Sequence, residues 1–205
     1  TAVDAGTGQV VWKASVKVEE ADRGRRILGI GLGGGSGGGG FGGGVTVGGG
    51  KVFVASGYRV MTAFDANTGA ELWRSTVDLP IHGAPTVSGN RVFVVDVDSQ
   101  LFAFDATTGA QDWTYRGIAE PARVMRASSP AVSGTTVVAP FASGQLVALS
   151  TLNGQAVWEE TLSRTSRTSA LSEVRDVAGR PVISRGMVFG VSHSGVMSAL
   201  DLRSG

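Results

Sequence analysis

Short apolar runs rich in valine alternate along nearly the whole chain with polar stretches rich in glycine, serine and threonine. Runs of this kind, bounded by turn-forming residues, are typical of β-strands. A sustained period of 3.6 residues, which would indicate helices, is missing apart from a short piece near 169–174. The pattern therefore predicts an all-β fold.

One sequence motif is repeated several times along the chain. It reads Ala-Phe-Asp-Ala-Thr-Thr-Gly-Ala-Gln-Asp-Trp over 103–113, and related copies lie at 2–12, 63–73 and 148–158, with a partial copy at 199–205. In most copies an aspartate opens a turn by bonding to nearby backbone, and a glycine closes it by adopting a positive φ. Each copy therefore predicts a strand, a tight turn and a second strand.

The recurring aspartate, glycine and tryptophan are expected to be framework residues. All four tryptophans follow the motif glycine by four residues, so we expect apolar anchors packed between layers rather than platforms for a ligand. Carboxylates at one repeated position are turn-formers rather than repeated catalysts. The predicted framework residues are Asp65, Gly69, Trp73, Asp105, Gly109, Trp113, Gly154 and Trp158.

The copies share a strict register from Val45 onward. Val45, Pro85, Pro130 and Pro181 each precede a motif glycine by 24 residues. Each block has room for three short strands, and the tryptophan strand follows as a fourth. A four-stranded sheet that repeats every 40 to 50 residues, roughly, indicates a β-propeller blade.

We therefore expect a single propeller segment of four-stranded antiparallel blades over 1–205. It divides into a leading tryptophan strand at 1–18, a charged and then glycine-rich loop at 19–44, blades at 45–83, 84–129 and 130–180, and a partial blade at 181–205.

Glycine is concentrated in one stretch. Residues 29–50 contain 15 of the 32 glycines, which leaves little side chain to pack, and we expect a mobile loop there. A phosphate cradle is poorly supported, because Lys51 is followed by Val52 and by a strand rather than by Ser or Thr and a helix. An engineered linker within 33–40 is a further alternative.

Composition excludes several kinds of site. The net charge of +1 gives no argument for nucleic acid, and the absence of cysteine excludes disulfides, thiolate metal sites and cysteine nucleophiles. The two histidines, His82 and His193, are too far apart in the sequence to argue for a metal pair or a catalytic dyad. We expect no enzyme activity and no cofactor. Because the chain starts and stops inside a repeat, it reads as part of something longer.

Length variation is confined to the segments that join one tryptophan to the next block. Loops that vary on a constant scaffold often bind partners. Solvated surface charge is an equally good interpretation of their composition. Two of these segments are rich in arginine, the first with Arg116, Arg123 and Arg126 and the second with Arg164, Arg167, Arg175 and Arg180.

With the repeats in register, the chain resembles the family of pyrroloquinoline-quinone-like propeller repeats, whose blades carry an Ala-x-Asp-x-x-Thr-Gly-x-x-x-Trp pattern. Four segments, at 42–47, 124–130, 171–183 and 198–205, most resemble the BamB family of outer-membrane protein assembly factors. The resemblance covers essentially the whole chain. It implies a propeller of about eight blades, of which about four are present here.

The resemblance also implies a function. It points to a non-catalytic scaffold in the periplasm, held at the outer membrane by a lipid anchor outside this chain. Its implied partners are a POTRA domain of BamA and unfolded outer-membrane proteins. Carried over onto this sequence, the contact residues are Arg123, Met125 and Arg126 in one loop, and Glu173 with Arg175 or Asp176 in the next.

Two alternatives to the scaffold stay open at this stage. Quinoprotein dehydrogenases use similar blades, but the adjacent cysteine pair of that family is absent and no calcium-like cluster stands out. A ligand-sensing propeller is the other alternative.

The incomplete blocks raise a separate question. Residues 9–18 form a tryptophan strand without a preceding block, whereas the block at Pro181 lacks its own tryptophan strand. The leading strand could complete the last blade of the same chain or of another copy.

Overall fold

The structure, a computed structural model, describes residues 1–16, 43–81, 83–118, 128–162, 177 and 179–205. These residues form seventeen strands and no helix, which confirms the all-β prediction. His82 and the short piece near 169–174 with a period of 3.6 residues lie outside the described residues.

Three consecutive four-stranded antiparallel sheets form complete blades. The first blade consists of β3 (Val45–Gly48), β4 (Lys51–Ser56), β5 (Val60–Asp65) and β6 (Glu71–Thr76). The second consists of β7 (Thr86–Ser88), β8 (Arg91–Val95), β9 (Gln100–Asp105) and β10 (Gln111–Arg116). The third consists of β11 (Ala131–Ser133), β12 (Thr136–Pro140), β13 (Gln145–Ser150) and β14 (Ala156–Thr161).

Two smaller sheets flank these blades. The last blade has three strands, β15 (Val182–Ser184), β16 (Met187–Val191) and β17 (Met197–Asp201). The leading hairpin pairs β1 (Ala2–Val3) with β2 (Val10–Trp12). In every sheet, strands adjacent in sequence are adjacent in space, as expected when tight turns join antiparallel neighbours.

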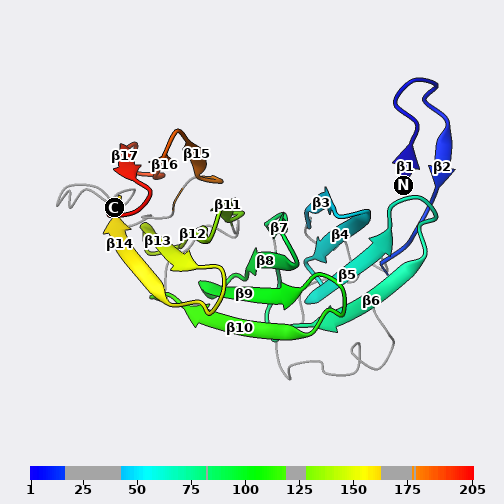
Figure 1. Cartoon of the computed structure of the whole chain (residues 1–205), viewed down its shortest axis with the longest axis horizontal. Helices are drawn as coiled ribbons and strands as arrows, with labels where there is room; N and C mark the ends of the chain where they lie inside the picture. The colour runs from blue at the N-terminus through cyan, green and yellow to red at the C-terminus, as the bar shows by residue number, and fades with distance from the viewer. Residues whose placement is uncertain (17–42, 82, 119–127, 163–176, 178) are drawn as a thin grey trace, which may run out of the picture.

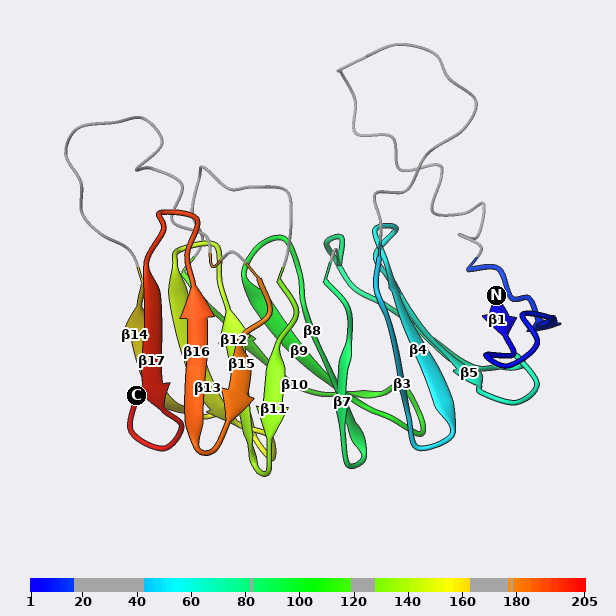
Figure 2. The same ribbon diagram turned by 90° about the horizontal axis from the view of Figure 1, so that it is seen from above.

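The blades follow an open arc (Figure 1). The first strand of each blade lies inside the arc and the fourth strand of each complete blade lies outside it. The leading hairpin and the last blade lie at opposite ends of this arc (Figures 1 and 2). The expectation that β2 could complete the last blade of the same chain is therefore wrong, because β2 packs beside the first blade instead.

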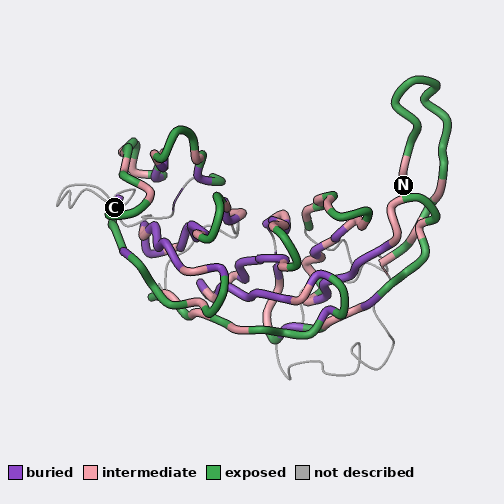
Figure 3. Tube along the Cα trace, viewed as in Figure 1, coloured by how far each residue is buried: buried purple, intermediate pink, exposed green. Residues whose placement is uncertain are grey.

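The core lies between the blades rather than inside a single sheet. Phe53, Met61 and Trp73 of the first blade are buried against Val92 and Phe104 of the second. Similar apolar layers join the second blade to the third and the third to the last. A central strand such as β9 is therefore buried on both faces along most of its length (Figure 3). Burying each large apolar side chain contributes about 1.5–3 kcal/mol to the fold.

Part of the glycine-rich stretch belongs to the first blade. Strand β3 begins at Val45, so a mobile loop running to residue 50 is a wrong expectation. A Cβ on Gly48 would lie 2.4 Å from Cγ1 of Val87, so glycine lets β3 approach the inner strand β7 closely. The proposed linker at 33–40 lies outside the described residues.

Candidate functional site

Each blade presents two opposite ends, which we call the turn face and the loop face. The turn face carries the turns between third and fourth strands, 66–70, 106–110 and 151–155, with 202–205 at the last blade. The loop face carries the turns between second and third strands, and there each fourth strand leads on toward the next blade (Figure 2).

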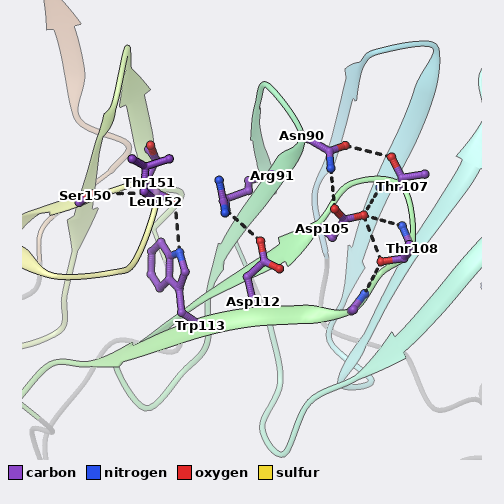
Figure 4. Close-up of polar contacts among 11 residues, drawn as sticks. Asn90, Arg91, Asp105, Thr107, Thr108, Asp112, Trp113, Ser150, Thr151 and Leu152 are labelled. Carbon is purple, nitrogen blue, oxygen red and sulfur yellow. Dashed lines mark hydrogen bonds and ion pairs between the residues drawn. The ribbon is translucent and has the colours of Figure 1, made fainter.

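The motif aspartate on the turn face is fully engaged by its own turn. Asp105 accepts hydrogen bonds from the backbone N–H groups of Thr107 and Thr108, both at 2.8 Å, and from the Thr108 hydroxyl at 3.0 Å (Figure 4). Its second oxygen accepts a hydrogen bond from the Asn90 side chain. The carboxylate therefore stabilises a turn and is not available as a catalytic base. The same arrangement of N–H and hydroxyl donors surrounds Asp4, Asp65 and Asp201.

These hydrogen bonds, led by the Thr108 N–H, lower the pKa of Asp105. The ionised carboxylate thus stabilises the fold above the unfolded-state pKa of about 3.9, and this contribution is lost as the pH falls through that value toward the lower folded-state pKa.

In Asp105→Ser, which copies Ser150 of the third blade, the loss of unfolding free energy relative to the parent should be larger at pH 7 than at pH 3. Urea unfolding at both pH values measures it, and an equal loss at both would contradict the role given to this carboxylate.

Each tryptophan joins its blade to the turn of the next blade. The indole Nε1–H of Trp73 donates a hydrogen bond to the carbonyl oxygen of Ala106 at 3.1 Å, and Trp113 does the same to Thr151 at 3.2 Å (Figure 4). Trp158 repeats the contact on Leu202 at 2.9 Å. The tryptophans are therefore anchors between blades, which leaves none of these indole N–H groups free for a ligand.

The motif glycine has a second role, in the packing between blades. Gly109 has a φ of 73°, and a Cβ built on it would lie 2.5 Å from Cε3 of Trp73 in the preceding blade. The turn needs glycine for its backbone conformation and for the space that the indole ring occupies. The repeat supplies a glycine and a tryptophan in every copy, but which tryptophan meets which glycine depends on how one sheet packs on the next.

The residues expected to bind a partner belong to the segments 119–127 and 163–176. Arg123, Met125, Arg126, Glu173, Arg175 and Asp176 all lie outside the described residues. The residues that directly follow the two segments are described, namely Ser128 after 119–127 and Val177 after 163–176.

These flanking residues are joined to each other. The Ser128 hydroxyl donates a hydrogen bond to the carbonyl oxygen of Val177 at 2.9 Å. The next hydroxyl, of Ser129, accepts a hydrogen bond from the backbone N–H of Ala84 at 2.8 Å. Val177 is itself buried and pairs with Ser192 of the last blade. Ser128 and Val177, which follow the two segments and are far apart in sequence, therefore meet at one place in the fold.

A buried carboxylate also lies on the loop face. Asp96 accepts hydrogen bonds from the backbone N–H groups of Asp98 at 2.8 Å and Gln100 at 2.9 Å, which shape the turn between β8 and β9. Burial raises the pKa of Asp96 despite these bonds.

No group of three or more His, Cys, Asp or Glu side chains within the described residues could hold a metal ion. Nor does the part of the chain that the structure describes contain a helix long and apolar enough to cross a membrane.

Comparison with known proteins identifies the family. The whole chain, residues 1–205, matches the family model described as outer membrane protein assembly factor BamB. The chain belongs to the BamB family. The BamB of Salmonella typhimurium is 36% identical over 196 residues, which cover 93% of this chain and 50% of that protein.

A solved BamB structure supports the same assignment. The crystal structure of BamB from Moraxella catarrhalis aligns with a TM-score of 0.72 and 25% identity over 78% of this chain and 49% of that chain. This BamB-family chain thus spans about half the length of the relatives it matches. The resemblance to a BamB propeller stated from sequence is confirmed.

The fold is also shared with enzymes. The quinohemoprotein alcohol dehydrogenase of Comamonas testosteroni aligns with a TM-score of 0.62, but at 15% identity over 79% of this chain and 33% of that enzyme. Such a likeness shows only a common propeller architecture. The BamB relatives, by contrast, are named as assembly factors.

Proposed function

We propose that this chain is part of a non-catalytic scaffold of the outer-membrane β-barrel assembly machinery. Its loop face docks on a POTRA domain of BamA, and the assembled protein aids delivery of unfolded outer-membrane proteins. The scaffold works in the periplasm, held at the outer membrane by a lipid anchor outside these residues. Membership of the BamB family supports the assembly role, since the relatives are named outer membrane protein assembly factors.

The observation that carries the docking site is the Ser128–Val177 hydrogen bond. It joins the residues that directly follow segments 119–127 and 163–176, which supports the proposal that both segments contribute to one surface. In that surface Met125 supplies an apolar anchor and Arg126 a planar set of donors for carboxylate or carbonyl groups. A few such apolar and arginine residues commonly dominate the binding energy of an interface.

The turn face is unsuited to the same task. Its aspartates, glycines and tryptophans are engaged in holding turns and adjacent blades together. A partner that contacted the tryptophans would have to separate the blades. Binding through the loop face leaves that framework intact.

Reversing the charge at Arg126 tests the proposal. Arg126→Glu should weaken binding of the purified protein to the BamA POTRA region at least tenfold, because a donor that pairs with acidic or carbonyl groups becomes a repelling carboxylate. Biolayer interferometry measures the dissociation constant, and circular dichroism checks the fold.

Arg203→Glu is the matched control. Arg203 is an exposed residue in the 202–205 turn of the turn face, so the same change of charge there should leave POTRA binding unaltered. Unchanged binding in Arg126→Glu, or equal losses in both variants, would rule out the proposed docking site.

A further inference from the structure

We propose that Ser128 is a positioning residue for docking, whose hydroxyl holds segment 119–127 in a fixed relation to segment 163–176. The inference rests on the proposed docking site and deepens it, because it names the group that sets the spacing of the two halves of that site. Ser128 acts through the two segments rather than as a contact of its own.

Ser128 departs from the repeat. The residue two positions before the block start is glycine in the other three blocks, namely Gly43, Gly83 and Gly179. A Cβ on Gly43 would collide with the carbonyl oxygen of Ala55, whereas one on Gly179 would meet nothing within 4 Å. A blade can therefore be built without a side chain at this position. The serine serves a purpose that the common framework of the blades does not require.

The acceptor of the Ser128 hydroxyl is held in place by the core. Val177 is 4% exposed and packs in the apolar cluster between the third and last blades. Its backbone N–H donates a hydrogen bond to the carbonyl oxygen of Phe141, and its backbone pairs with Ser192 of the last blade. The Val177 carbonyl is thus a fixed point directly after segment 163–176.

Three hydroxyl groups hold the chain directly after segment 119–127. The Ser128 hydroxyl donates to the Val177 carbonyl at 2.9 Å. On the other side, the Ser129 hydroxyl accepts a hydrogen bond from the N–H of Ala84 at 2.8 Å, and the buried Thr86 hydroxyl donates to the carbonyl oxygen of Pro130 at 2.6 Å. The last two bonds lead back to the connection between the first and second blades. Of the three, the Ser128 bond is the one that relates the two halves of the docking site.

This bond joins two long connections. The residues before Pro130 and Pro181 extend 17 and 23 positions back to the preceding tryptophan, against 12 positions before Pro85. A longer segment loses more conformational entropy when its residues are fixed for binding. A bond at the base of both long connections reduces that loss, and the short connection has Gly83 in place of the serine.

The strength of one hydrogen bond sets the size of the expected effect. The net contribution of such a bond corresponds to about a fivefold change in an equilibrium constant. When fewer molecules have both segments in place, the apparent affinity falls by the same factor as that population. Loss of Ser128 should therefore slow association, while the contacts of the formed complex, which set the dissociation rate, stay the same.

Ser128→Ala tests the inference directly. This variant should bind the BamA POTRA region about fivefold more weakly than the parent, with a lower association rate and an unchanged dissociation rate. Biolayer interferometry measures both rates. Ser128→Thr keeps the hydroxyl and should bind like the parent. A faster dissociation rate with unchanged association in Ser128→Ala would contradict positioning, because it would show a lost contact.

Ser129→Ala is the matched control. It removes a hydroxyl one residue away and a hydrogen bond of similar length, but Thr86 still holds the Pro130 carbonyl and Ser128 still holds Val177. Its affinity should stay within about twofold of the parent. Parent-like binding in Ser128→Ala, or equal losses in the two alanine variants, would overturn the positioning role.

Arg126→Glu, measured in the same series, separates this inference from the docking site itself. Weak binding in Arg126→Glu with parent-like binding in Ser128→Ala would show that the docking site is right and the positioning role wrong. Parent-like binding in both variants would show that the docking site is wrong, and the positioning role would fall with it.

Discussion

Replacing Gly109 with alanine should lower the free energy of unfolding by about 2–5 kcal/mol. The φ of 73° costs a residue with a Cβ about 1–2 kcal/mol. The new Cβ would also lie 2.5 Å from the Trp73 ring, and overpacking of this kind costs about 1–3 kcal/mol. Urea unfolding followed by circular dichroism measures the loss.

Gly134→Ala separates the two causes. Gly134 also has a positive φ, of 57°, but a Cβ there would meet nothing within 4 Å. This variant should therefore lose only the conformational part, about 1–2 kcal/mol. Equal losses at Gly109 and Gly134 would show that a Cβ at position 109 does not disturb the packing of the Trp73 ring.

Trp73→Ala should be at least as damaging, with a loss of about 3–5 kcal/mol. The Trp73 ring is buried between the first and second blades, and its centroid lies 5.9 Å from that of Phe53. Truncation removes this packing and leaves the Ala106 carbonyl without the indole donor. The same urea titration measures the effect.

Trp73→Phe is the graded comparison. It keeps an aromatic ring between the blades but loses the Nε1–H bond to Ala106, which contributes about 1 kcal/mol, so its loss should be well below that of Trp73→Ala. A loss below about 1 kcal/mol in Trp73→Ala would contradict the view that tryptophans hold neighbouring blades together.

Much of the fold could be predicted because its signals are local. An aspartate that accepts hydrogen bonds from the backbone of its own turn, followed by a glycine with positive φ, determines where one strand ends and the next begins. The Asp105–Gly109 turn is an example. The repeat of this turn at fixed spacing then predicts sheets of four strands. The register placed the first blade from Val45, where β3 begins, but the glycine content of 29–50 favoured a loop over the same residues, and the contact of Gly48 with Val87 explains why glycine is needed there.

The contacts between blades were not predictable in the same way. The pairing of Trp73 with Gly109, and of Ser128 with Val177, joins residues 36 and 49 positions apart in the sequence. Such pairs depend on how one sheet packs on the next, which the residue pattern of a single blade does not contain. The expected partner-binding residues of the two loops remain predictions, because they lie outside the described residues.

We propose that the two faces of the arc have separate roles, with the turn face holding blades together and the loop face binding the partner. Photo-crosslinking from a benzoylphenylalanine introduced at Met125 or at Leu152 tests it most directly. Both positions carry apolar residues, and Leu152 is exposed on the turn face. We expect a covalent adduct with the BamA POTRA region from position 125 and none from position 152. An adduct from position 152 with none from position 125 would contradict it.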